Sequence, residues 1–265
     1  MGMPITVEIV ESSHASNGRA KIQSAIDKVF EYFRYVDGKY SVYKESSEIT
    51  DINRGRTSIV KASAEIKEIF KLAEKTKQET GGYFDIVNRQ GIYDPSGIVK
   101  GWAILNAANL LKGLGFTDYC VEAGGDIQTA GSNSKGQKWR IGIKNPFKQS
   151  EIIKVIQLGG EGVATSGTYI RGQHIYNPKN MAEAIEDIVS LTVIGPNVYE
   201  ADRFATAAFA MGKKGIEFIE RQEGLEGYII DKKGIATMTS GFERYVVRSG
   251  SPGHSYFGLR ALALF

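Results

Sequence analysis

Cysteine is almost absent from this 265-residue chain: Cys120 is the only one, so no internal disulfide and no thiolate metal cluster can form. The apolar stretch around Cys120 indicates a buried, inert thiol. No run of 18 apolar residues occurs, so the sequence contains no candidate membrane span. The charge is also nearly balanced, because 33 basic residues accompany 30 acidic ones. The resulting net charge of +3 argues against a nucleic-acid surface and suits a polyanionic small molecule such as a nucleotide.

Targeting signals are missing from the N-terminus. Residues 1–8 (MGMPITVE) read as the start of a strand and contain no basic n-region, no apolar h-region and no lipidation cysteine. We therefore expect a cytoplasmic protein. The alternative is an exported or membrane-anchored protein whose signal was removed from this sequence. The oligomeric state stays open.

Helical and strand patterns follow one another without a regular βαβ rhythm, and this mixture predicts an α+β fold. Hydrophobic residues make up 42% of the chain, which is enough to bury a core. We expect one domain over residues 1–245 and a tail of unassigned role over residues 246–265. A turn at Asp37 and Gly38 is expected to end the first helix. The predicted helices cover 19–36, 62–79, 98–112, 200–211 and 213–221, and the predicted strands cover 7–10, 118–122, 138–143, 152–158, 162–165, 188–194, 227–231 and 235–239.

The first candidate for a binding site is the segment DPSGIVKGW at residues 94–102. A turn that contains Asp94 and Ser96 leads directly into a helix. Gly97 lets the backbone approach a ligand, and Lys100 adds a positive charge near the unpaired N–H groups of the helix start. This combination suits a phosphate group. An ordinary capped helix with a solvated lysine explains the segment as well.

Two loops pair glycine with polar side chains. Gly124 and Asp126 lie in the segment EAGGDI, which fits either a ligand-contacting turn or a plain hairpin. Ser166 and Gly167 lie in the segment ATSGTY, where hydroxyls around a glycine can bind phosphate or ribose. His174 follows and could orient or deprotonate a hydroxyl, although a histidine between strands often has no such role.

A small-residue helix at 200–211 carries Asp202 and Thr206 at positions i and i+4, so both face the same side. A carboxylate and a hydroxyl or carbonyl oxygen at that spacing can share a hard cation. Mg²⁺ prefers oxygen ligands and takes few of them from the protein. Asp94 and Asp126 are further acids that could balance the charge of a cation. A capped helix that packs through its alanines is the alternative interpretation.

The order of these segments resembles that of the ApbE family of FAD:protein FMN transferases, over roughly residues 1–240. The resemblance implies a mixed α/β sandwich of the ApbE type. The departure lies in the segment HIYNPKNM, where the family usually has His-x-x-Asp-Pro-x-Thr-Gly. The matching segments, in chain order, are MGM (1–3), SVYKESSEITDIN (41–53), FD (84–85), DPSGIVKGW (94–102), GGD (124–126), WRIGIKNP (139–146), TSG (165–167), HIYNP (174–178) and ADRFATA (201–207).

The resemblance also implies roles for individual residues. It assigns the metal ligands to Asp202, to Thr206 and to a backbone carbonyl in the turn from Gly97 to Val99. It implies a pocket for FAD around this metal. The other residues that it places in the pocket are Met1 or Met3, Tyr43 (stacked on a flavin or adenine ring), Glu48, Gly124 and Asp126.

The activity implied by the resemblance is Mg²⁺-dependent transfer of FMN from FAD to a Thr or Ser of an acceptor flavoprotein. Lys100 and His174 would lie beside the diphosphate, with His174 as the candidate base and Asp202 holding the metal. Three alternatives stay open. Water could replace the acceptor, which gives an FAD pyrophosphatase that releases FMN and AMP. The altered segment after His174 is also compatible with a non-catalytic FAD-binding protein, and a structural or adaptor protein would bind no flavin.

Overall fold

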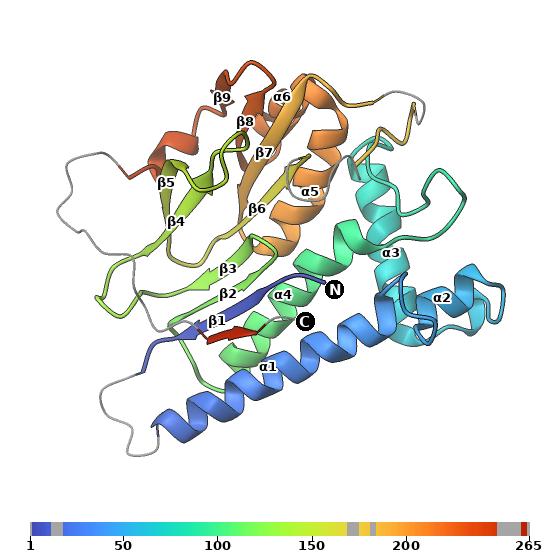
Figure 1. Ribbon diagram of the computed structural model, residues 1–265, viewed down its shortest axis with the longest axis horizontal. Helices are drawn as coiled ribbons and strands as arrows, with labels where there is room; N and C mark the ends of the chain where they lie inside the picture. The colour runs from blue at the N-terminus through green and yellow to red at the C-terminus, as the bar shows by residue number, and fades with distance from the viewer. Residues whose placement is uncertain (1, 12–17, 169–174, 181–183, 248–260, 264–265) are drawn as a thin grey trace.

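The computed structural model describes residues 2–11, 18–168, 175–180, 184–247 and 261–263. An antiparallel sheet in the order β10-β1-β2-β3-β6-β7-β8-β9 runs through these residues (Figure 1). A separate hairpin pairs β4 with β5. The strands are Ile5–Ile9 (β1), Tyr119–Ala123 (β2), Asp126–Ala130 (β3), Trp139–Lys144 (β4), Ile152–Leu158 (β5), Gly162–Gly167 (β6), Ile188–Gly195 (β7), Glu226–Asp231 (β8), Ala236–Met238 (β9) and Ala261–Ala263 (β10).

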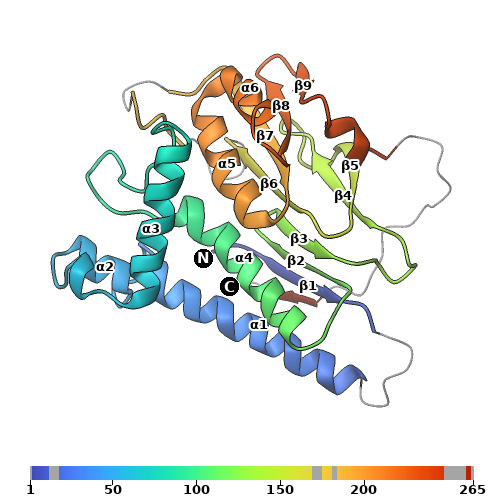
Figure 2. The same ribbon diagram turned by 180° about the vertical axis from the view of Figure 1, so that it is seen from behind.

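Helices cover one face of the large sheet. The helix α4 packs on β2, and α5 packs on β6 and β7, while α1 lies along the outer side of α4 (Figures 1 and 2). The β4–β5 hairpin covers the opposite face of the sheet. The helices are Gly18–Tyr40 (α1), Glu48–Asn53 (α2), Ala64–Glu79 (α3), Ser96–Gly113 (α4), Val198–Ala210 (α5) and Gly215–Glu220 (α6), with 3₁₀ turns at Ile59–Lys61, Gly212–Lys214 and Phe242–Tyr245.

The two-residue period of the strands explains this layering, because successive side chains of a strand point to opposite faces. In β7, Leu191 and Val193 belong to the core beneath α5. Ile194 of the same strand belongs to a second core that includes Ile143 and Ile156 of the β4–β5 hairpin. Both faces of the central strands are therefore buried, which agrees with their nearly continuous apolar sequence.

The α+β class predicted from the sequence is confirmed, and each predicted helix and strand has a counterpart at the same place in the chain. The predicted end of the first helix at Asp37 and Gly38 is wrong, because α1 continues to Tyr40. Val36 and Tyr40 are both buried at spacing i and i+4, and this packing outweighs the low helix propensity of Gly38. The 1–245 domain limit stays a prediction, and Ala261–Ala263 of the tail pairs with β1.

No helix within the described ranges is long and apolar enough to cross a membrane.

Candidate functional site

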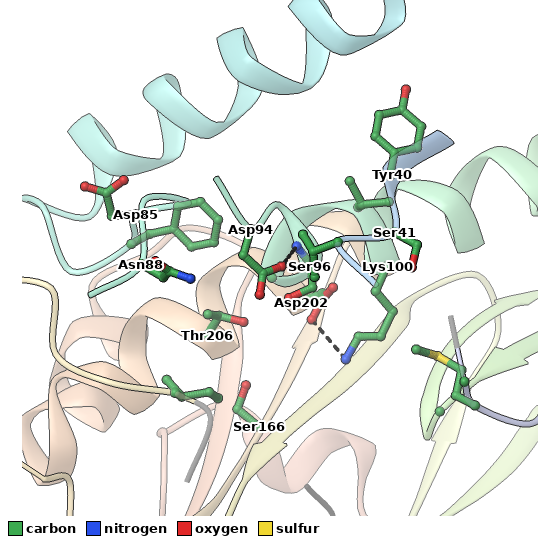
Figure 3. A pocket seen from close by; sticks show the side chains of 18 of the residues that line it. Tyr40, Ser41, Asp85, Asn88, Asp94, Ser96, Lys100, Ser166, Asp202 and Thr206 are labelled. Atoms are coloured by element: carbon green, nitrogen blue, oxygen red, sulfur yellow. Dashed lines mark hydrogen bonds and ion pairs between the residues drawn. The ribbon is translucent and has the colours of Figure 1, made fainter. Parts of the chain in front are cut away.

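A cleft of about 620 Å³ opens beside the first turns of α4, and it is bordered by α5, the end of α1 and the loops after α3 and β6 (Figure 3). Lys100 and Asp202 lie in its middle. Figure 3 shows Tyr40 and Ser41 on one side of this pair, and Asp85 and Asn88 on the other. Met3, Val36, Val42, Tyr83, Ile175 and Tyr176 add apolar and aromatic surface to the walls.

Close packing of α4 against α5 builds the middle of the cleft. A Cβ added to Gly101 would lie 2.7 Å from the Cβ of Asp202, and a Cβ added to Gly97 would lie 3.3 Å from the Cγ2 of Thr206. Glycines at i and i+4 on α4 therefore meet polar residues at i and i+4 on α5. Only glycine permits this approach, which brings Asp202 and Thr206 to the start of α4.

A hydrogen bond fixes where α5 begins. The backbone N–H of Val198 donates to Oε1 of Gln128 on β3 at 2.8 Å, and the side chain of Asn197 accepts from the N–H of Glu200 at 2.9 Å. Both bonds satisfy donors that a helix start leaves open. Strand β3 was not predicted from the sequence, since polar residues interrupt its apolar pattern. Its Gln128 is nonetheless what aligns α5 with the sheet.

Two buried carboxylates, of Asp126 and Asp202, lie around the ammonium group of Lys100 at the middle of the cleft. Nζ of Lys100 lies 2.6 Å from Oδ2 of Asp126 and 3.4 Å from Oδ1 of Asp202. The remaining carboxylate oxygens accept backbone N–H groups, from Thr165 to Asp126 at 3.0 Å and from Gly101 to Asp202 at 2.8 Å. With both acids ionised, the three side chains carry one net negative charge.

This charge excess is energetically costly in the absence of a further cation. Burial raises the pKa of Asp202 above its ordinary value; Lys100 opposes the rise and Asp126 adds to it. Asp202 is only 2% exposed, so solvent screens the charge poorly. An additional cation at the exposed edge of this trio would favour the ionised form of Asp202.

The donor set fits Mg²⁺ with few protein ligands. Asp202 and Thr206 both line the cleft, and so do Gly97 and Val99, which lie in the first turn of α4. Within the described part of the chain, no group of three or more His, Cys, Asp or Glu residues could hold a metal ion. A hard cation here would therefore take its other ligands from water or from a phosphate group.

Most of the side chains expected at the site are brought together by the fold. Asp126 is not part of the lining but contacts Lys100 from below. Met1 and His174 lie outside the described residues. The predicted site residues that line the cleft are Met3, Tyr43, Asp94, Ser96, Gly97, Val99, Lys100, Gly124, Ser166, Gly167, Asp202 and Thr206.

Glu48, which the resemblance places in the pocket, is not among the residues that line the cleft. Its carboxylate accepts hydrogen bonds from the backbone N–H and the hydroxyl of Ser63, at 2.6 and 2.8 Å. Lys39 adds an ion pair at 3.6 Å. Glu48 therefore joins α2 to the start of α3.

Tyr43 stands at the rim of the cleft and is 92% exposed. The loop that carries it is held in shape, since the hydroxyl of Ser47 donates to the carbonyl of Ser41 at 2.7 Å. Its ring is thus presented to solvent on a fixed loop, as expected for a side chain that stacks on a ligand ring.

The segment from Asp85 to Asp94 forms one wall of the cleft, and its residues 86–93 were not placed in the site by the sequence analysis. The side chain of Asn53, on α2, holds this segment in place through two hydrogen bonds. It donates to the carbonyl of Tyr93 and accepts from the N–H of Tyr93, both at 2.9 Å. From the other side, the hydroxyl of Tyr176 donates to the carbonyl of Val87 at 2.9 Å. Local sequence patterns do not predict these hydrogen bonds, because each bond joins residues that are at least 40 positions apart.

Since the resemblance implies that this cleft binds FAD, the Tyr176→Phe substitution is expected to weaken that binding roughly 3- to 10-fold, because one net hydrogen bond that holds this wall is lost while the ring stays. Flavin fluorescence titration measures the affinity. Tyr245→Phe, which alters a ring of the 3₁₀ turn at Phe242–Tyr245, is the matched control and should bind like the wild type. Equal affinity in all three proteins would show that the wall does not depend on Tyr176.

Comparison with known proteins agrees with this geometry. The model of the ApbE family matches residues 1–92 and 87–229 of the chain. The FAD:protein FMN transferase of Escherichia coli K12 is 32% identical over 150 residues, which are 53% of this chain and 43% of that protein. The FAD:protein FMN transferase of Vibrio cholerae is 32% identical over 169 residues, 60% of this chain and 49% of that protein. The chain thus spans about half the length of the curated relatives it matches.

Two solved structures share the fold over nearly the whole chain. The ApbE protein of Thermotoga maritima superposes with a TM-score of 0.78 at 23% identity, covering 91% of this chain and 96% of that one. The flavin transferase ApbE of Vibrio cholerae has the same TM-score and identity, with coverages of 92% and 96%. At these identities, the likeness establishes the fold.

Proposed function

The chain belongs to the ApbE family, and from this premise we propose that it transfers FMN from FAD to a Thr or Ser side chain of an acceptor flavoprotein. The observation that carries the proposal is the charged centre of the cleft, where Lys100, Asp202 and Thr206 meet between two walls with aromatic side chains. A dinucleotide has the same layout, with a charged diphosphate between two ring systems. The relatives named FAD:protein FMN transferase support this choice of dinucleotide.

In the proposed reaction, the hydroxyl oxygen of the acceptor attacks the phosphorus on the FMN side of the diphosphate. A new P–O bond forms, the bond to the bridging oxygen breaks, and AMP leaves with that oxygen. The proton of the hydroxyl passes to a base, for which His174 is the candidate. The ammonium group of Lys100 reduces the negative charge that repels the attacking oxygen.

Mg²⁺ is the cofactor that this site would hold through Asp202, Thr206 and a carbonyl of Gly97 or Val99. When bound, it supplies positive charge to the diphosphate and stabilises the charge that develops on the leaving phosphate. The buried excess of negative charge at Lys100, Asp126 and Asp202 supports the presence of a cation. Asp94 lies just before α4, and its side chain accepts the N–H of Ser96, the first residue of that helix, at 3.0 Å.

The test is an acceptor assay with the purified chain, FAD and a flavoprotein domain that carries a Thr or Ser flavinylation site, with and without EDTA. The proposal expects flavin fluorescence that stays with the acceptor after denaturing electrophoresis, together with AMP, and neither product in EDTA. Release of AMP and free FMN without labelled acceptor would instead identify an FAD pyrophosphatase. If the chain binds FAD but releases no AMP over hours, it is an FAD-binding protein without catalysis, and the proposed transfer is overturned.

A further inference from the structure

Two turns outside the cleft each present a bulky apolar side chain to solvent. Phe147, in the turn between β4 and β5, is 58% exposed, and Ile235, in the turn between β8 and β9, is 61% exposed. Single exposed apolar residues are common on protein surfaces and need no explanation. The two turns are adjacent, however, because a Cβ added to Gly234, the residue before Ile235, would lie 3.8 Å from Cε2 of Phe147.

Side-chain hydrogen bonds hold both turns rigid. Oδ1 of Asn145 accepts the N–H of Phe147 at 2.9 Å. In the second turn, Oδ1 of Asp231 accepts the N–H groups of Lys233 and Ile235, at 2.8 and 2.9 Å. Such bonds fix the backbone of a turn. The apolar side chains are therefore displayed in defined positions, and no conformational entropy of the backbone has to be lost when they bind.

Four lysines lie in or beside the two turns. Lys144 and Lys148 flank the first turn, Lys232 and Lys233 belong to the second, and all four are exposed. Lys148 pairs with Glu151. Across the part of the chain that the structure describes, no carboxylate lies within ion-pair distance of the other three. We name the six residues Lys144, Phe147, Lys148, Lys232, Lys233 and Ile235 the basic tip surface.

We propose that the basic tip surface docks the protein onto an anionic lipid membrane. Peripheral binding of this kind combines apolar side chains that enter the headgroup region with basic side chains that meet acidic lipids. A protein partner fits less well, because lysine is depleted in protein–protein interfaces. The surface shares no residue with the cleft lining, so the proposal is independent of the proposed catalytic function.

The experiment is sedimentation of the purified chain with phosphatidylcholine vesicles that contain either no phosphatidylserine or about 30% of it. The chain is expected to pellet with the anionic vesicles only, and less so as salt is raised. Lys232→Gln/Lys233→Gln should lower the partition coefficient roughly tenfold or more. Phe147→Ser/Ile235→Ser should lower it as well, because the apolar contribution is removed.

Matched control variants separate this surface from general attraction by positive charge. Lys67→Gln/Lys71→Gln removes two exposed lysines at i and i+4 on α3 and is expected to leave the partition coefficient unchanged. Melting temperatures of all variants check that the fold is intact. Equal loss in the α3 control, equal binding to neutral vesicles, or no pelleting at low salt would each overturn the proposal.

Discussion

Replacing Asp202 by asparagine is expected to lower the rate of FMN transfer on the order of 100-fold at saturating FAD. The amide keeps the shape of the side chain and can still accept the hydrogen bond from the N–H of Gly101, 2.8 Å away in the wild type. What it removes is the negative charge that a cation needs. The rate is measured by the appearance of covalent flavin on the acceptor at several Mg²⁺ concentrations.

Stability measurements distinguish this loss from misfolding. A carboxyl group whose pKa is raised on folding lowers the free energy of unfolding as it ionises. The loss of stability grows as the pH rises from the pKa of the unfolded state to that of the folded state, and it stays constant at higher pH. Burial raises the pKa of Asp202. Metal-free Asp202→Asn should therefore melt no lower than the wild type at pH 8. Added Mg²⁺ should raise the melting temperature of the wild type and not that of the variant.

Asp27→Asn is the matched control for this prediction. Asp27 is an exposed residue of α1 that accepts a hydrogen bond from Gln23, and the same change of charge there should leave both rate and Mg²⁺ response intact. Transfer at the wild-type rate in Asp202→Asn would remove Asp202 from the proposed metal site. A lowered melting temperature without Mg²⁺ would assign its main role to the packing of α4 against α5.

The sequence predicted elements well where a single periodicity dominates. Helix α3 and strand β7 have regular apolar patterns, and their bounds differ from the prediction by at most two residues. Strand β3 is not among the predicted strands, because Gln128 and Thr129 break its apolar run. Their side chains bond to groups that are distant in sequence, such as the carbonyl of Gly160 and the N–H of Val198. A pattern of neighbouring residues cannot report such partners.

The same limit applies to the site. Asp202 and Thr206 could be paired from the sequence, because helical spacing places i and i+4 on one face. The wall made by Tyr176, Val87 and Asn53 could not, since it depends on contacts between separate loops. The bonds from Ser63 to Glu48 are likewise contacts between separate elements that neighbouring residues do not reveal.

Replacing Gly162 by alanine is expected to destabilise the fold by about 3 kcal/mol, the upper range for overpacking. A Cβ at this position, at the start of β6, would lie 1.9 Å from the backbone N of Val198 and 2.4 Å from its Cα. Backbone atoms cannot rotate away as a flexible side chain can. The start of α5 must therefore shift, and the hydrogen bond from Val198 to Gln128 is strained or lost.

Gly38→Ala is the matched control, since Gly38 lies inside α1 and a Cβ there meets nothing within 4 Å. That variant should gain roughly 0.5 to 1 kcal/mol, the helix preference of alanine over glycine. Urea unfolding measures the free energy of unfolding of both variants. An unchanged m value would show that the substitution changed the stability alone. Because α5 carries Asp202 one turn after Val198, whatever fraction of Gly162→Ala stays folded should also respond less to Mg²⁺. Wild-type stability in Gly162→Ala would mean that the position of α5 does not depend on its contact with β6. Other contacts would then have to hold Asp202 in the cleft.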